Sequence, residues 1–299
     1  MIPYRCVYWD ISGVCNAACR YCPSGSKSLL GNFHKSQAGF ISPRDFNSAL
    51  DHLTYQGVIS PWLTHLALYN WGEPFIHPQF EDMVTITAKK GFAYSLSTNA
   101  SILKLIPVNA IDKLGEVKFS MPGFSQASYD KIHGFEFDAV LENIKKTVSH
   151  VRSFSDKVKF VISFHVYEFN KQELSLARDF CSANGIGFWP IYATLCGIKM
   201  PQDSQLYDLS DLCVGEWNKI MSRQPQTWIC PQYDVLALDE YCNVVQCCVA
   251  ERFTPGYVIG KIKAVDFDML RETRQKAPIC LDCVNGGIGF LAHNIDYRG

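Results

Sequence analysis

Short apolar runs alternate with segments of helical spacing along residues 1–200. The pattern predicts strands at residues 7–12, 65–69, 94–97, 117–120, 158–166 and 187–192, and helices at residues 42–56, 80–90, 137–151 and 173–183. Ser42 followed by Pro43 is a helix start signal, and Gly185 is a helix stop signal. Alternating strands and helices indicate an α/β fold with a parallel sheet. Six units in about 190 residues are too few for a closed eight-fold barrel, so we predict a partial (β/α)6 barrel.

The strand–helix alternation stops near Pro201. A helical pattern over residues 206–221 then leads into a region with six cysteines and one more predicted helix at residues 265–274. We therefore predict two domains, the barrel at residues 1–200 and a linker helix with a small second domain at residues 201–299.

Composition narrows the class of protein. The net charge is −1, so no global field attracts nucleic acid or an anionic membrane. No apolar stretch reaches the roughly 18 residues of a membrane span, and no secretory signal begins the chain, so we expect a cytoplasmic protein. In that reducing compartment the 13 cysteines indicate metal binding rather than disulfides.

Cys15, Cys19 and Cys22 place three thiols within eight residues, directly after the first predicted strand. Three thiolates on a [4Fe–4S] cube leave one iron with an open position, as in an open catalytic metal site. A zinc knuckle and simple packing are the alternatives. Structural zinc requires a fourth ligand, for which His34 is the local candidate.

With three and then two residues between the cysteines, the motif resembles that of the radical S-adenosylmethionine (SAM) superfamily. Asn70, Trp71, Gly72, Glu73 and Pro74 resemble the superfamily's Gly-Gly-Glu motif, with Trp71 in place of the first glycine. The resemblance implies that Glu73 and the backbone near it hold the methionyl ammonium of SAM by a charge-assisted contact. It further implies cofactor contacts at Tyr21, Asn70, Gly72, Ser97, Asn99 and Ser120.

The same resemblance implies the chemistry. A one-electron donor such as flavodoxin or ferredoxin reduces the cluster, SAM is cleaved, and the 5′-deoxyadenosyl radical takes a hydrogen atom from the substrate. The cofactor carries this reaction, and the protein orients the reactants and excludes water.

The second cysteine group resembles the SPASM or twitch extension of this superfamily. The resemblance implies that Cys230, Cys247, Cys280 and Cys283 bind one auxiliary [4Fe–4S] cluster. Cys242 stands where the hairpin turn normally has glycine. Structural zinc on the same four thiolates is the alternative.

Cys248 is left over from this ligand set. If both residues belong to a strand, Cys248 points away from the face of Cys247 and toward the barrel. A thiol there can donate a hydrogen atom to a substrate radical, so Cys248 is the candidate catalytic residue. Packing as a small apolar residue and cluster ligation remain as alternatives.

We therefore predict a radical SAM enzyme that epimerises one carbon of a polar small molecule, such as a sugar, aminoglycoside or aminocyclitol. Only 14 residues precede Cys15, which leaves no room for the leader-binding domain of many peptide modifiers. Dehydrogenation of an alcohol through the auxiliary cluster, and modification of a ribosomal peptide, are alternatives. A non-enzymatic iron–sulfur or zinc protein would have no use for the Gly72-Glu73 turn.

Overall fold

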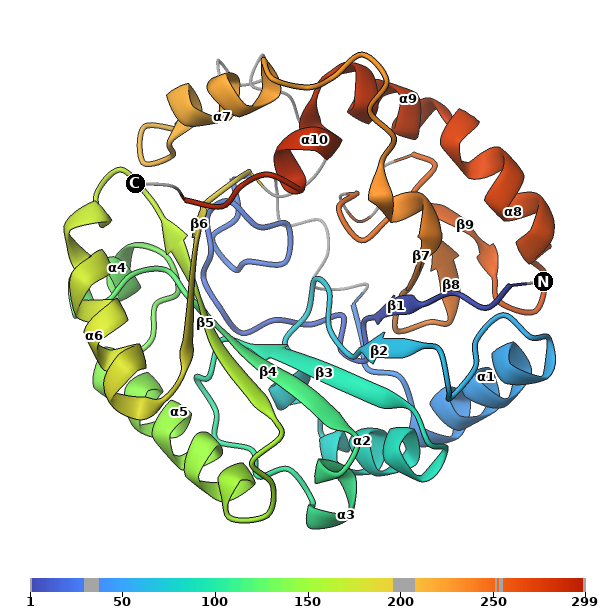
Figure 1. Cartoon of the computed structure of the whole chain (residues 1–299), viewed down its shortest axis with the longest axis horizontal. Coiled ribbons are helices and arrows are strands. Elements are labelled where there is room, and N and C mark those ends of the chain that lie inside the picture. The colour runs from blue at the N-terminus through green and yellow to red at the C-terminus, as the bar shows by residue number, and fades with distance from the viewer. Residues whose placement is uncertain (1, 30–37, 196–207, 251, 253–254, 298–299) are drawn as a thin grey trace.

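A computed structural model of the chain describes residues 2–29, 38–195, 208–250, 252 and 255–297. Six parallel strands follow one another in chain order and curve around an open centre (Figure 1). They are β1 (Cys6–Trp9), β2 (His65–Ala67), β3 (Ala93–Thr98), β4 (Leu114–Met121), β5 (Lys159–Val166) and β6 (Gly187–Tyr192). Each strand overlaps a predicted one, and the predicted partial (β/α)6 barrel is confirmed.

Helices cover the outside of this curved sheet (Figure 1). They are α1 (Pro43–Tyr55), α2 (Phe80–Lys89), α3 (Val108–Ile111), α4 (Gln126–Lys131), α5 (Phe137–Arg152) and α6 (Leu174–Asn184), with 3-10 turns η1 (Pro74–Ile76) and η2 (Lys171–Glu173). The Ser42 hydroxyl accepts the backbone N–H of Asp45 at 3.1 Å, which confirms the predicted start of α1. Gly185, at φ 63°, ends α6 as predicted. The short helices α3 and α4 were not predicted, because four to six residues carry too little periodicity.

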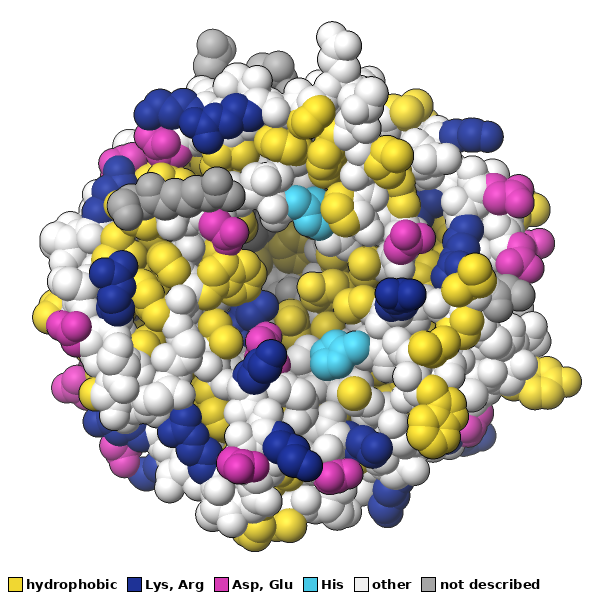
Figure 2. Space-filling view, in the orientation of Figure 1, with side chains coloured by type: hydrophobic (Ala, Val, Ile, Leu, Met, Phe, Trp, Pro, Cys, Tyr) yellow, Lys and Arg dark blue, Asp and Glu magenta, His cyan; other side chains and the backbone are white. Residues whose placement is uncertain are grey.

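The two faces of the sheet differ in polarity. On β4, Val117 and Phe119 are fully buried in the apolar core, whereas Glu116, Lys118 and Ser120 alternate with them and are half-buried. The barrel interior therefore carries polar side chains. Figure 2 shows the surface hollowed at the centre of this face, with charged and histidine side chains around the hollow.

The C-terminal part extends the same sheet. Strand β7 (Val235–Leu238) pairs in parallel with β1, and β8 (Asn243–Val245) and β9 (Val258–Lys261) follow antiparallel. Helices α7 (Val214–Met221), α8 (Phe267–Thr273), α9 (Pro278–Asn285) and α10 (Ile288–Ala292) and the 3-10 turns η4 (Pro231–Asp234) and η5 (Arg274–Lys276) complete the described chain. None of the helices in the described ranges is long and apolar enough to cross a membrane.

Two predictions for this part need comment. The predicted helix at residues 206–221 begins only at Val214, and its first two residues lie outside the described chain. The predicted domain boundary at residues 200 and 201 also lies outside the described residues and stays a prediction.

The hairpin turn between β7 and β8 explains the position of Cys242. Its φ is 58°, the left-handed conformation that favours glycine, as its place in the motif predicts. The extension of the strand to Cys248 was wrong, because β8 ends at Val245. The next carbonyl, that of Gln246, accepts the Arg274 Nε–H at 2.6 Å instead of continuing the ladder.

Candidate functional site

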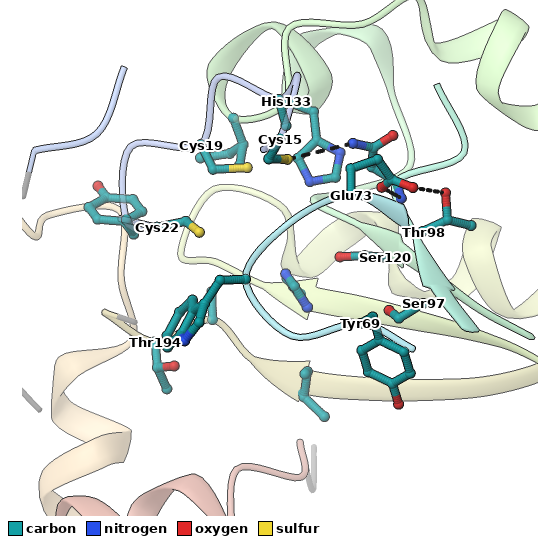
Figure 3. Close-up of a pocket in the computed structure, with 18 of the residues that line it drawn as sticks. Cys15, Cys19, Cys22, Tyr69, Glu73, Ser97, Thr98, Ser120, His133 and Thr194 are labelled. Atoms are coloured by element: carbon teal, nitrogen blue, oxygen red, sulfur yellow. Dashed lines mark hydrogen bonds between the residues drawn. The ribbon is translucent and has the colours of Figure 1, made fainter. Parts of the chain in front are cut away.

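A cavity of ≈ 320 Å³ lies at the carboxyl ends of the parallel strands (Figure 3). This edge is where α/β sheets place their ligand sites. Every residue predicted for the first site lines the cavity: Cys15, Cys19, Tyr21, Cys22, Asn70, Gly72, Glu73, Ser97, Asn99 and Ser120. The fold therefore brings together residues from the loop after β1, the turn after β2 and the ends of β3 and β4.

The three cysteines lie on the loop that follows β1, and their sulfur atoms face the same space in Figure 3. Backbone bonds hold the loop in shape, including Gly25 N–H to the Cys22 carbonyl at 3.0 Å. A Cβ on Gly25 would lie 2.0 Å from the Cys19 carbonyl oxygen, so only glycine fits there.

The arrangement of these thiols bears on the kind of metal group that they could bind. Within the described ranges, no three His, Cys, Asp or Glu side chains converge as ligands of one metal ion. The thiols of a [4Fe–4S] cube bind different iron atoms and need not meet at one point. His34, the candidate fourth zinc ligand, lies outside the described residues.

Glu73 is buried at 3% exposure and points to the end of β3 (Figure 3). Its carboxylate accepts the Thr98 hydroxyl at 2.7 Å, the Asn99 N–H at 2.7 Å and the Phe75 N–H at 3.0 Å. All three donors are neutral, and burial raises the pKa of Glu73 to about 7. The site therefore presents an oriented acidic group that a cationic ligand would stabilise as the carboxylate.

Asp10, the residue that follows β1, binds the turn before Glu73. One Asp10 oxygen, Oδ1, accepts the N–H groups of Trp71 at 2.8 Å and Gly72 at 3.0 Å. A Cβ on Gly72 would lie 1.7 Å from the Ser12 carbonyl oxygen, which explains why glycine occupies this position. The φ of Trp71 is not positive, so tryptophan can replace the superfamily's first glycine without adopting a backbone conformation that favours glycine.

A buried charge triad supports Asp10, and the sequence analysis missed it. Arg252 Nη1 lies 3.8 Å from Asp10 Oδ2, and Arg252 Nη2 donates to both Glu240 oxygens at 2.6 and 2.7 Å. Burial raises the pKa of Asp10 to about 7, and Arg252 opposes that rise. The only sequence signal was a charged residue, Asp10, in the apolar run 7–11.

Three further predicted residues of the cavity wall have hydrogen-bond partners. The Tyr21 hydroxyl donates to the Asp208 carbonyl at 3.3 Å and to Asp211 Oδ2 at 3.4 Å. Asn99 Nδ2 donates to Asn16 Oδ1 at 3.0 Å and lies 4.0 Å from Cys15 Sγ. In the side-chain amide orientation that gives Asn70 hydrogen-bond partners, its Nδ2 donates to the Cys248 carbonyl at 3.0 Å.

Histidines also reach this cavity. His133 and His165 both line the wall. Burial lowers the pKa of His133 to about 3 and that of His165 to about 4, so both rings are neutral at pH 7. Tyr167 lines the cavity as well, whereas Glu168 forms an exposed pair with Lys171.

The second group of thiols also comes together. Cys230, Cys247, Cys280 and Cys283, the four predicted ligands, line a small cavity of ≈ 20 Å³. Arg274 lines the same cavity at 4% exposure. Its Nη2 is buried without a hydrogen-bond partner in the described chain. A buried guanidinium donor beside four thiols fits an anionic metal–thiolate group.

Cys248 lines neither that small cavity nor the large one. Its thiol donates to Gln232 Oε1 at 3.1 Å, and its carbonyl accepts Asn70 from the wall of the large cavity. A hydrogen bond from Cys248 to Cys247 lowers the pKa of Cys247 to about 6 and raises the pKa of Cys248. The two neighbouring thiols therefore lie in different environments, although no strand pleat separates them.

The sequence and the fold resemble those of known proteins to different extents. No protein-family model matches the chain. The tungsten-containing aldehyde ferredoxin oxidoreductase cofactor-modifying protein of Pyrococcus furiosus is 29% identical over 147 residues, which are 48% of this chain. The match covers 38% of that relative, little more than a third of its length.

Several solved structures share the fold. SuiB of Streptococcus suis bound to S-adenosylmethionine aligns with a TM-score of 0.60 at 13% identity, over 97% of this chain and 72% of SuiB. The protein anSMEcpe with bound AdoMet aligns with a TM-score of 0.59 at 14% identity, over 93% of this chain and 82% of that one. Both structures were solved with S-adenosylmethionine bound. The chain therefore has the partial-barrel fold of the radical SAM enzymes, which its cysteine motif predicts.

Proposed function

We propose that this protein is a radical SAM enzyme. The observation that carries the proposal is that all ten residues predicted for the first site line one cavity at the carboxyl ends of the strands. Their order along the chain and their meeting in space both match what the motif implies. The SAM-bound structures that share the fold add support.

Within this proposal the chain's residues have distinct tasks. Cys15, Cys19 and Cys22 would hold a [4Fe–4S] cluster, and Glu73 would accept the ammonium of SAM. When bound, the cluster and SAM together supply a carbon radical that abstracts a substrate hydrogen. Glu73 is oriented for its task by its three neutral donors, which leave its negative charge uncompensated.

We also propose that Cys230, Cys247, Cys280 and Cys283 hold an auxiliary [4Fe–4S] cluster. The buried Nη2 of Arg274 at the same cavity supports an anionic group there. Structural zinc on four thiolates has the same donor chemistry, so iron analysis must separate the two.

For the reaction, we propose epimerisation with Cys248 as the hydrogen-atom donor. The support is its position, since Asn70 of the large cavity binds its carbonyl, whereas the thiol lies outside the small cavity. The substrate carbon would lose a hydrogen atom to the 5′-deoxyadenosyl radical on the SAM side and take one from the Cys248 S–H on the other side, which leaves a Cys248 thiyl radical. One electron from the flavodoxin- or ferredoxin-type donor and one proton from solvent would return that sulfur to the thiol. We propose a polar small molecule as the substrate.

Dehydrogenation is the second candidate, because a cluster on the four thiols next to Cys248 would accept the electron that the substrate radical loses, while the proton leaves to solvent. Peptide modification is a third, since SuiB bound to the precursor peptide SuiA shares the fold, with a TM-score of 0.60.

Anaerobic reconstitution with iron and sulfide tests the proposal. The protein should bind about eight iron atoms in two clusters and form 5′-deoxyadenosine from SAM with dithionite. Replacing Cys15, Cys19 and Cys22 together by alanine should leave about four iron atoms and abolish the product. A wild-type protein that binds only zinc would refute the proposal.

Two single variants test the reaction assignment. Cys247→Ala should lose auxiliary iron. Cys248→Ala should keep its iron and form 5′-deoxyadenosine, yet return little hydrogen to the substrate. Turnover in deuterated water distinguishes the outcomes, because epimerisation adds one deuterium, whereas dehydrogenation removes two hydrogens. If Cys248→Ala makes product normally with both clusters intact, the donor assignment fails.

A further inference from the structure

Lys118 brings a positive charge into the barrel interior. It lies on β4 between Val117 and Phe119, which are fully buried in the apolar core on the outer face. Period-two alternation therefore turns Lys118 inward, on the same face as Ser120. The Lys118 residue is half-buried, and burial lowers the pKa of its ammonium.

Aromatic rings fix the position of this ammonium. Its Nζ lies 4.6 Å from the ring centroid of Trp189 on β6 and 6.0 Å from that of Tyr69 after β2. Both distances are within the range of cation–π attraction. Rings from two separate strands thus hold the charge inside the barrel rather than letting it extend into solvent.

The ammonium has no direct anionic partner. Among the described residues it makes no ion pair and no hydrogen bond. Glu116, two residues earlier on the same face, acts on Lys118 through space and raises its pKa without forming an ion pair. The neighbouring ring of His165 on β5 is neutral at pH 7. An ammonium offers three donors, and these remain available to a ligand.

Lys118 is not itself a lining residue of the proposed substrate cavity, but it lies next to residues that are. Two of its neighbours, Tyr69 and His165, line that cavity. Ser120, two residues further along β4, lines it too, which puts the two Cα atoms about 7 Å apart at the usual rise of a strand. That separation is comparable to the width of one small ring-shaped molecule.

We propose that Lys118 binds an anionic group, a carboxylate or a phosphate, on the substrate of this enzyme. The inference rests on the proposed function in one respect, that the large cavity is where the substrate reacts. It narrows the polar small molecule to an acidic one. The anionic group is held at Lys118 while the reacting carbon lies toward Ser120 and the three cysteines.

A structural role for Lys118 is the competing explanation. In that case the aliphatic stem packs between Trp189 and Tyr69, and the charge has no ligand. The two explanations differ in what small anions do at this residue. The test therefore uses inorganic phosphate and glycolate, which are small enough to reach the ammonium without matching an unknown substrate.

Competitive lysine acetylation, followed by mass spectrometry of the reconstituted protein with SAM, measures access to each ammonium. Phosphate or glycolate at millimolar concentration should slow acetylation of Lys118 at least threefold, relative to sodium chloride of equal ionic strength. Lys157, which is exposed before β5, is the control and should change less than 1.5-fold. Stronger protection by phosphate indicates a phosphorylated substrate, and stronger protection by glycolate indicates a carboxylate. Unchanged labelling of Lys118 by both anions would overturn the proposal.

A variant series gives an independent measurement. The more protective anion should raise the melting temperature of wild type and of Lys118→Arg, and this shift should be lost in Lys118→Gln and kept in Lys157→Gln. An equal shift in Lys118→Gln would overturn the assignment, because the anion would then bind elsewhere. Formation of 5′-deoxyadenosine by the wild-type protein is measured in the same preparation. If the protein forms 5′-deoxyadenosine but the anions do not protect Lys118, only the anion-binding role of Lys118 is refuted. If the anions protect Lys118 but no 5′-deoxyadenosine forms, only the radical SAM function is refuted.

Discussion

The buried charge triad gives the sharpest prediction about stability. Arg252 is 3% exposed and faces two carboxylates, Asp10 at 1% exposure and Glu240 at 2%. Arg252→Met retains an unbranched stem of similar shape but removes the guanidinium. Both carboxylates then stay buried without a cation, a situation that costs about 3–5 kcal/mol in other proteins. A domain is typically stable by only ~5–15 kcal/mol, so the loss should be large.

Urea unfolding of the reduced protein, followed by tryptophan fluorescence, measures this loss. Arg223→Met is the matched control, because Arg223 is exposed and such surface changes cost within about 0.5 kcal/mol. Adding Glu240→Gln to Arg252→Met should recover at least about 1 kcal/mol, since it removes one of the two unpaired charges. If Arg252→Met unfolds at the same urea concentration as Arg223→Met, the triad does not stabilise the fold and the reasoning is refuted.

The loss should also depend on pH. Burial raises the pKa of Asp10 to about 7, above its ordinary value of 3.8. A carboxyl group with a raised pKa in the folded state makes stability fall as pH rises from its ordinary pKa to the folded one. Without Arg252 that pKa rises further, so Arg252→Met should lose more stability at pH 8 than at pH 6. An equal loss at both values would mean that Asp10 does not respond to Arg252.

Three further predictions concern the sites themselves. Gly72→Ala should weaken SAM binding at least tenfold, because its Cβ would lie 1.7 Å from a backbone oxygen. Gly215→Ala is the control and should leave SAM binding unchanged, because open space surrounds Gly215. Calorimetry measures the affinity of both variants for SAM. The affinity for SAM should fall up to tenfold per unit of pH below about 7, as Glu73 becomes protonated, and Glu73→Gln should remove this dependence. Arg274→Met should lower the reduction potential of the auxiliary cluster, because a buried cation stabilises the more negatively charged reduced form. Potentiometric titration with EPR detection measures the shift, and an unchanged potential would contradict the prediction.

Local signals account for what the sequence predicted well. The strands β1 to β6 carry apolar runs of their own, and the helix ends at Ser42 and Gly185 are marked by capping residues. The predicted residues of the large cavity sit at strand ends, and parallel strands bring such ends to one edge. A motif and a strand pattern were therefore enough to predict which residues line one cavity.

Long-range pairing accounts for what was missed. Nothing in the sequence near β7 indicates that it pairs with β1, because that ladder joins segments more than 200 residues apart. The ion pair between Arg252 and Asp10 depends on the same ladder. The expected strand at Cys247 and Cys248 came from the resemblance to the SPASM or twitch hairpin, and β8 ends at Val245. The contact of Arg274 with the Gln246 carbonyl, which ends it, is visible only in three dimensions.

The position of β1 explains how two sets of cysteines that are far apart in the sequence can serve one reaction. Strand β1 lies between β2 and β7, so the loop after β1, the turn after β2 and the hairpin after β7 all begin on adjacent strands. Asp10, at the end of β1, binds the turn after β2 and faces Arg252, which follows Cys248 by four residues. Asn70 of that turn in turn binds the Cys248 carbonyl. A displacement of the Cys248 segment must therefore disturb the Gly72 turn, and the geometry of the proposed hydrogen donor is coupled to that of the proposed SAM site by direct contacts.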